Sequence, residues 1–135
     1  MQKTAKDLCP CGSARMYDSC CGSYISGELI PPTAEALMRS RYTAYTQANI
    51  TYIQATMREE AAENFDPIGA EQWARAAKWK WLRVVRTFPH ASDEQYYYVE
   101  FIAYYILQGQ PQKITEISEF KRIAGRWYYT RRVEC

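Results

Sequence analysis

The sequence predicts an α+β fold, with helices first and a long antiparallel sheet after them. Apolar residues recur at helical spacing up to about residue 77, and from Lys78 onward the period shortens to that of strands. Helices that precede strands, instead of alternating with them, are typical of α+β proteins. A group of four cysteines comes before both parts. The length of 135 residues fits one domain with a small appendage.

The four cysteines form two close pairs, Cys9 with Cys11 and Cys20 with Cys21, separated by eight residues. Such pairs bring four thiolates within reach of one Zn²⁺ ion, and in a reducing cytosol clustered cysteines indicate a metal site before disulfides. A set of free thiols is the weaker alternative, because free cysteines normally occur singly. Four thiolates leave no open position, so we predict a structural zinc site. Cys135 is expected to be a free, mobile thiol.

Three segments follow from this pattern. Residues 1–24 contain too few apolar side chains for a core of their own, so we expect metal to supply their order. Residues 25–32 are predicted to form a linker that Pro31 and Pro32 stiffen. Residues 33–135 are predicted to form the α+β domain.

The first helix is predicted to begin after Thr33, a good N-cap residue, with Glu35 in its first turn. Arg41 lies on its apolar stripe. The other members of the stripe are Ala34, Leu37, Met38, Tyr42 and Tyr45.

A second, short helix is predicted from Asn49 to about Met57, and a polar loop over residues 58–65. Asp66 as N-cap and Pro67 at the first position are typical of the start of a third helix.

Four strands are then predicted, and the last three form a meander of hairpins. Their ranges are 78–88, 95–107, 113–123 and 126–132. We expect the sheet to be strongly curved and to wrap around the first helix as a cone.

Two carboxylates interrupt largely apolar rows of these strands. Glu116 shares a face with Ser118, and Glu100 lies on the row of the preceding strand that starts at Tyr96. A core-facing carboxylate must be paired, hydrogen-bonded or protonated. We expect Arg41 to be the partner of Glu100 or Glu116. This group is either a pocket acid or base, or a structural ion pair.

Composition argues against two classes of partner. The net charge is +2, with 17 basic and 15 acidic residues, and does not indicate binding to nucleic acid. Trp79 and Trp81, expected on one strand face, could stack on bases, but no basic channel flanks them, so we assign them to the core or a pocket wall. No segment has the length of a membrane span and none resembles a signal peptide. We therefore expect a cytoplasmic protein without a nucleic-acid or membrane partner.

The motif from Cys9-Pro-Cys-Gly-Ser to Asp-Ser-Cys20-Cys21-Gly resembles the SEC-C zinc motif, found at the end of the SecA translocation ATPase and on many bacterial proteins. The rest resembles the YchJ-like family of bacterial proteins, which has no established activity. The segments that carry this resemblance are residues 32–45, Val99-Glu-Phe101, Glu116-Ile-Ser-Glu-Phe120 and Gly125-Arg-Trp-Tyr-Tyr129. The resemblance implies a cone-shaped domain like that of nuclear transport factor two, with a pocket on the concave sheet face.

Two functions remain open. The first is a protein-interaction adaptor that docks through the zinc segment, because the motif in SecA-type proteins contacts a chaperone and the ribosome. Its partners would belong to the translation or secretion machinery, and an exposed basic or apolar patch on residues 1–24 would favour it. The alternative is an enzyme or small-molecule-binding protein that uses the cone pocket. An open cavity that contains Glu100 or Glu116 without Arg41 as partner would favour the alternative.

Overall fold

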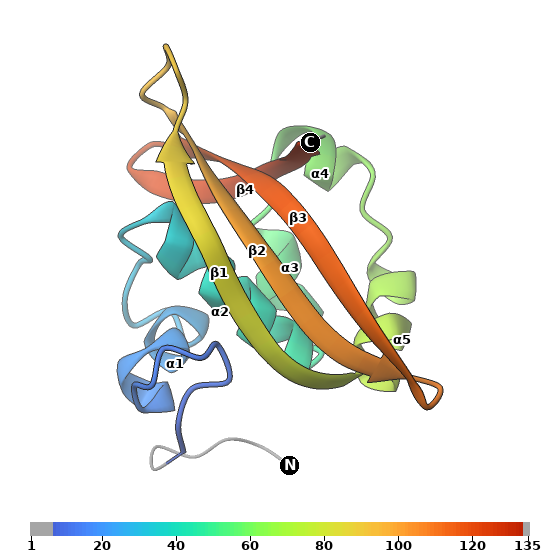
Figure 1. Ribbon diagram of the computed structural model, residues 1–135. Helices are drawn as coiled ribbons and strands as arrows, with labels where there is room; N and C mark the ends of the chain where they lie inside the picture. The colour runs from blue at the N-terminus through green and yellow to red at the C-terminus, as the bar shows by residue number, and fades with distance from the viewer. Residues whose placement is uncertain (1–6, 134–135) are drawn as a thin grey trace.

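The computed structural model describes residues 7–133, so the prediction for Cys135 lies outside the described residues. Helices occupy the first half and strands the second, as predicted (Figure 1). The helices are the short 3-10 helix η1 (Tyr17–Ser19), α1 (Cys21–Ile25), α2 (Ala34–Thr46), α3 (Ile50–Ala55), α4 (Glu59–Glu63) and α5 (Pro67–Ala76). The strands are β1 (Lys78–Pro89), β2 (Tyr96–Leu107), β3 (Gln110–Ile123) and β4 (Arg126–Val133).

Three helices begin directly after the capping residues from which their starts were predicted. The side chain of Thr33 accepts a hydrogen bond from the backbone N–H of Ala36 at 3.0 Å, at the start of α2. Asn49 and Asp66 cap α3 and α5 in the same way. These side chains satisfy N–H groups that the helix itself leaves unpaired.

Helix α4 lies within residues 58–65, which were predicted to be a loop. Glu59 and Glu60 stand in its first turn, where the helix dipole favours negative charge. Tertiary contacts hold the segment, because the backbone N–H of Arg58 donates to the carbonyl of Tyr129 in β4 at 3.0 Å. The prediction of a loop was therefore wrong here.

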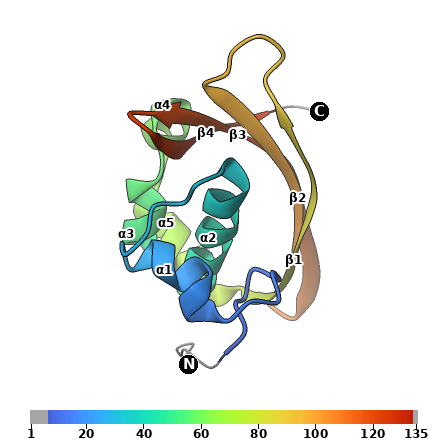
Figure 2. The same ribbon diagram turned by 90° about the vertical axis from the view of Figure 1, so that its left-hand side faces the viewer.

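The four strands form one antiparallel sheet in the order β1-β2-β3-β4, so the predicted meander of the last three strands is confirmed and β1 extends it. Figure 2 shows that the sheet curves around α2 and that the helices lie on its concave side. The register places Glu116 of β3 opposite Phe101 of β2, and Ser118 opposite Val99. Because paired residues share a face of the sheet, all four side chains point to the concave side.

A β-bulge between Trp79 and Trp81 changes the face on which Trp81 lies. Trp79 packs inward against the core. Trp81 is 47% exposed and stacks on the ring of Tyr104, with 3.8 Å between the ring centroids. The expectation that the two tryptophans share a face was wrong, because an extra residue shifts the alternation by one.

The four cysteines belong to the main hydrophobic core. They cluster with residues of α2 and of the sheet, among them Leu37, Tyr42, Leu82 and Phe120. The cysteine segment therefore packs directly against the cone instead of standing apart from it. In the described residues, no helix is both long enough and apolar enough to cross a membrane.

Candidate functional site

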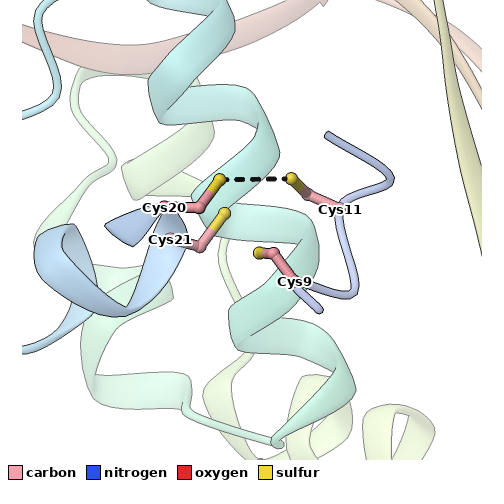
Figure 3. Close-up of side chains that lie close together, drawn as sticks. All are labelled: Cys9, Cys11, Cys20 and Cys21. Carbon is pink, nitrogen blue, oxygen red and sulfur yellow. Dashed lines mark hydrogen bonds between the residues drawn. The ribbon is translucent and has the colours of Figure 1, made fainter. Parts of the chain in front are cut away.

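The four predicted ligands meet at one point beside α2. Cys9 and Cys11 come from the N-terminal loop, Cys20 and Cys21 from the start of α1, and their sulfur atoms face one another (Figure 3). The sulfurs all lie within 4.8 Å of one another, and all four residues are at most 5% exposed. Sulfurs at about 2.3 Å from a tetrahedral ion would lie about 3.8 Å apart. The Cys11–Cys20 distance of 3.6 Å fits this value, so the cluster could hold a metal ion.

The loop and α2 hold the thiols in place. Gly12 has a φ of +82°, and a Cβ there would lie 3.3 Å from the carbonyl oxygen of Leu82, so glycine suits this turn. From α2, Arg39 donates to the carbonyl of Cys11 at 2.7 Å, and the hydroxyl of Thr43 lies 3.8 Å from the sulfur of Cys9. Helix α2 thus supports the cluster at two points.

The thiols perturb one another strongly. Hydrogen bonding with Cys21, and then with Cys9, lowers the pKa of the Cys11 thiol below its ordinary value. Hydrogen bonding with Cys11 raises the pKa of Cys21. One thiolate therefore forms at the expense of its neighbours, and a bound cation is what would let all four ionise.

A second site lies inside the cone, between α2 and the concave face of the sheet. It is a cavity of about 190 Å³. Most of its lining is aromatic or aliphatic. The residues are Met38, Arg41, Tyr42, Tyr45, Trp73, Trp79, Phe101, Ala103, Ile114, Glu116, Ser118, Phe120 and Tyr129. Three predicted candidates, Arg41, Glu116 and Ser118, are thus brought together, and the indole rings of Trp73 and Trp79 meet edge to face beside them.

Arg41 is 7% exposed, but it does not form the expected ion pair. Its Nη1 donates to the carbonyl of Ile53 at 2.8 Å and to the hydroxyl of Thr56 at 2.6 Å. Its guanidinium carbon lies 4.8 Å from the centroid of the Tyr129 ring. Among the described residues, no carboxylate lies within 4.0 Å of it, and its burial lowers the pKa of the guanidinium. The prediction of a direct Arg41–Glu116 pair was therefore wrong, because the end of α3 supplies the oxygen acceptors.

Glu116 reaches the cavity from β3 and is held by hydroxyl groups. Its Oε2 accepts hydrogen bonds from Ser118 at 2.5 Å and from Tyr129 at 3.0 Å. Two hydroxyl groups thus fix the position of this side chain at the cavity wall. Burial, and then the charge of Glu116, raises the pKa of Tyr129, so this phenol stays protonated.

Glu100 does not belong to this site. Its row of β2 faces the convex side of the sheet, where its Oε1 lies 2.6 Å from Nε of Arg86. The row that faces the cone is the other one, in which Val99 is 0% and Ala103 is 2% exposed. Glu100 was placed wrongly because both rows of β2 are apolar, so alternation alone does not decide which one faces inward.

Tyr129 is the site residue that the sequence analysis missed. It connects Arg41, under whose guanidinium its ring lies, to Glu116, to which its hydroxyl donates. The alternation of β4 from Trp127 to Tyr129 could have placed both on the inward row. The partners of Arg41 at Ile53 and Thr56 had no such pattern, because a backbone carbonyl and a helix-terminal hydroxyl carry no sequence motif.

Comparisons with known proteins agree with this fold. Residues 33–132 match the family model described as the middle NTF2-like domain of YchJ. A UPF0225 protein of Geobacter sulfurreducens is 38% identical over 124 residues, which cover 92% of this chain and 77% of that protein. The UPF0225 protein YchJ of Shigella dysenteriae serotype 1 is 37% identical over 124 residues, covering 90% and 80%.

Two solved structures are also similar. The solution structure of a SEC-C motif containing protein from Rhodopseudomonas palustris has a TM-score of 0.83 and 34% identity, and the match covers 94% of this chain and 98% of that one. The crystal structure of a SEC-C motif containing protein from Psychrobacter arcticus has a TM-score of 0.82 and 29% identity, covering 94% and 82%. The fold, the cysteine cluster and these matches agree, and the chain belongs to the YchJ-like UPF0225 family.

Proposed function

We propose that the protein binds a small molecule in the cone pocket, and that the cysteine cluster is a structural zinc site that holds one wall of this pocket. The observation that carries the proposal is the state of Arg41. Its Nη1 is bonded, but among the described residues no hydrogen bond reaches its Nη2 or Nε. Among the described residues, no fully enclosed side-chain nitrogen or oxygen lacks a partner, so Nη2 and Nε are not fully enclosed, and Arg41 is one of the residues that line the cavity.

A buried cation with free donors is costly to keep. The desolvation of an ion costs several kcal/mol, and direct pairing with a carboxylate, which usually offsets it, is missing here. Pockets for small ligands combine apolar walls with a few polar groups and with residues of perturbed pKa. Arg41 and Glu116 supply those polar groups in a cavity that is otherwise mostly aromatic.

One aromatic pair lies between the pocket and the neighbouring surface groove. Tyr42 and Trp79 line the cavity and also a surface groove of about 1120 Å³. Their rings meet edge to face at a centroid distance of 5.9 Å. If the pocket catalyses a reaction of the ligand, Glu116 is the one carboxylate of the lining that can accept a proton from it.

Native mass spectrometry tests the proposal. The protein is incubated with a small-molecule extract of bacterial cells and its mass is compared with that of the untreated protein. We expect one retained molecule per chain in the wild type and none in Arg41→Met. Arg86→Met, which removes an arginine from the convex face, is the matched control and should retain the molecule. An unchanged mass of the wild type in the extract would refute the proposal.

The identity of the metal is tested separately. Four thiolates are soft ligands in a closed shell, which favours zinc in a structural role. Metal analysis of freshly purified, reduced protein should give one zinc per chain, and Cys21→Ser should lower this value strongly. A different metal at full occupancy, or a disulfide among the four cysteines, would contradict the assignment.

A second candidate function, the adaptor, is favoured by one observation. Leu8 and Met16 are 58% and 38% exposed and lie opposite each other in an isolated antiparallel bridge on the cysteine segment. A surface fixed by metal loses little freedom on docking. A partner from the translation or secretion machinery in the cytoplasm would then be captured by the wild type. It should be lost with Leu8→Ser combined with Met16→Ser and kept with Ile68→Ser, a change at an exposed residue of α5. Equal capture by all three would argue against docking at this surface.

A further inference from the structure

We infer that the ligand of the cone pocket is an uncharged, planar, one-ring molecule that carries both a hydrogen-bond acceptor and a hydrogen-bond donor, as an aromatic amide does. The inference rests on the proposed function and adds the chemical class of the ligand. Three properties of the cavity carry it: its size and walls, the polar atoms that remain free, and its total charge.

The size and the walls select a single flat ring. An apolar cavity of about 150 Å³ in another protein holds benzene, and this one measures about 190 Å³. Tyr45, Trp73 and Trp79 form one side, with ring centroids between 4.9 and 6.1 Å apart. Aromatic walls favour a flat ring in stacked or edge-to-face contact over a branched aliphatic molecule. The space beyond the ring admits a substituent of a few atoms.

The polar atoms that have no partner are complementary to a ligand with both a hydrogen-bond acceptor and a hydrogen-bond donor. Arg41 offers Nη2 and Nε, which are donors without a partner among the described residues. Glu116 offers Oε1, which accepts no hydrogen bond from any described residue. Its two donors, Ser118 and Tyr129, both donate to Oε2. A ligand oxygen can therefore accept from Arg41 while a ligand N–H donates to Glu116. An amide group places these two functions on one carbon atom.

The total charge of the pocket lining favours a neutral ligand. Arg41 and Glu116 are the two charged residues of the lining, so the pocket has a formal charge of zero. A charged ligand would leave one charge uncompensated in a site of low dielectric constant, where such charges interact most strongly. A carboxylate would meet Arg41 but would lie close to Glu116, and a cation would meet Glu116 but would lie close to Arg41.

Four ring compounds of nearly equal size separate these properties. Benzamide has an acceptor and a donor, benzoate has acceptors and a negative charge, benzamidinium has donors and a positive charge, and toluene has neither function. Their dissociation constants for the zinc-loaded full chain are measured by ligand-detected NMR. We expect benzamide to bind at least about tenfold more tightly than each of the other three.

Glu116→Gln changes the charge without changing the shape. The amide oxygen of glutamine can still accept from Ser118 and Tyr129, but the pocket now has a charge of +1. The affinity of the variant for benzoate should be at least about tenfold higher than that of the wild type and should exceed its affinity for benzamide, because the charge of Arg41 is no longer compensated. Glu100→Gln makes the same chemical change on the convex face and should leave the order of the four compounds as in the wild type. A thermal melt of each variant confirms that it is folded.

The outcomes of these experiments test the ligand class separately from the proposed function. Equal binding of all four rings, tightest binding of toluene, or no gain for benzoate in Glu116→Gln would overturn the inference while leaving a ligand site in place. Binding of none of the four would also overturn it. A charged molecule identified in the extract experiment would overturn the ligand class and support the proposed function, whereas retention of nothing from the extract would refute the function itself.

Discussion

Replacing Arg41 by methionine should leave the stability of the protein nearly unchanged. The substitution removes two charge-assisted hydrogen bonds, to the carbonyl of Ile53 and the hydroxyl of Thr56, and the contact with the ring of Tyr129. Each such bond contributes about 1.5–3 kcal/mol, and the ring contact about 1–2 kcal/mol. The gross loss is therefore about 4–8 kcal/mol.

Two gains offset this loss. The folded state no longer keeps an ion out of water, which recovers several kcal/mol, and the buried methionine adds about 1.5–3 kcal/mol. No acceptor is orphaned, because the carbonyl of Ile53 still accepts from the backbone N–H and the hydroxyl of Thr56. We expect the free energy of unfolding to stay within about 2 kcal/mol of the wild type. A buried ion pair, as expected from the sequence, would instead give a loss of about 3–5 kcal/mol.

Urea denaturation followed by tryptophan fluorescence measures this difference. Leu37→Ala is the reference for a structural residue of the same helix, because Leu37 is 1% exposed and its truncation should cost about 2–5 kcal/mol. If Arg41→Met lost as much stability as Leu37→Ala, Arg41 would be a structural residue. The argument from its free donors would then fail.

Three further predictions follow from the same geometry. If the cysteine cluster holds the proposed zinc, chelation should lower the midpoint of one transition of the whole protein, seen by circular dichroism, because Cys21 shares its core with the sheet; a separate early transition would contradict this. Burial, followed by the charge of Cys11, raises the pKa of Tyr42 from 10.0 to about 12. The contribution of Tyr42 to the free energy of unfolding is therefore complete below pH about 10, and up to about 3 kcal/mol of this free energy is lost as the pH rises through about 12. In Tyr42→Phe the urea midpoint should fall less steeply with pH over this range than in the wild type. An equally steep fall in the variant would exclude Tyr42 as the cause. Glu100→Gln should change the free energy of unfolding by less than about 1 kcal/mol, because its partner Arg86 is exposed on the convex face; a larger loss in urea would show that the pair is structural.

Local chemistry made most of the fold predictable. Thr33 and Asp66 mark helix starts because their side chains satisfy backbone N–H groups, a property of single residues. The strands were predictable because the extended backbone places successive side chains on opposite faces, and the sequence from Lys78 onward follows this alternation. Helix α4 was not, since its five residues depend on contacts with β4 that no local pattern encodes.

The candidate site was predictable only in part, because it depends on which face of each strand turns inward. Glu116 was placed correctly, since Phe120 on its row is large and apolar and is buried against the cone. On β2 the inward row holds the buried Val99 and Ala103 together with the rings of Tyr97 and Phe101, whereas Tyr104 lies on the convex face and stacks on Trp81. Both rows are apolar, so packing against helices far away in the sequence decided this face, and hydrophobicity alone did not.

The order of the elements along the chain sets the order in which the two sites can be completed. Synthesis proceeds from the N-terminus, so the residues nearest to it emerge first. All four cysteines and Arg41 are made before the first strand, whereas Glu116 and Tyr129 lie in the last two strands. A chain interrupted before Tyr129 therefore carries every thiol of the cysteine cluster but only part of the pocket. The residues of the cysteine cluster are therefore all present before β1 is made, whereas those of the pocket are all present only once β4 has been made.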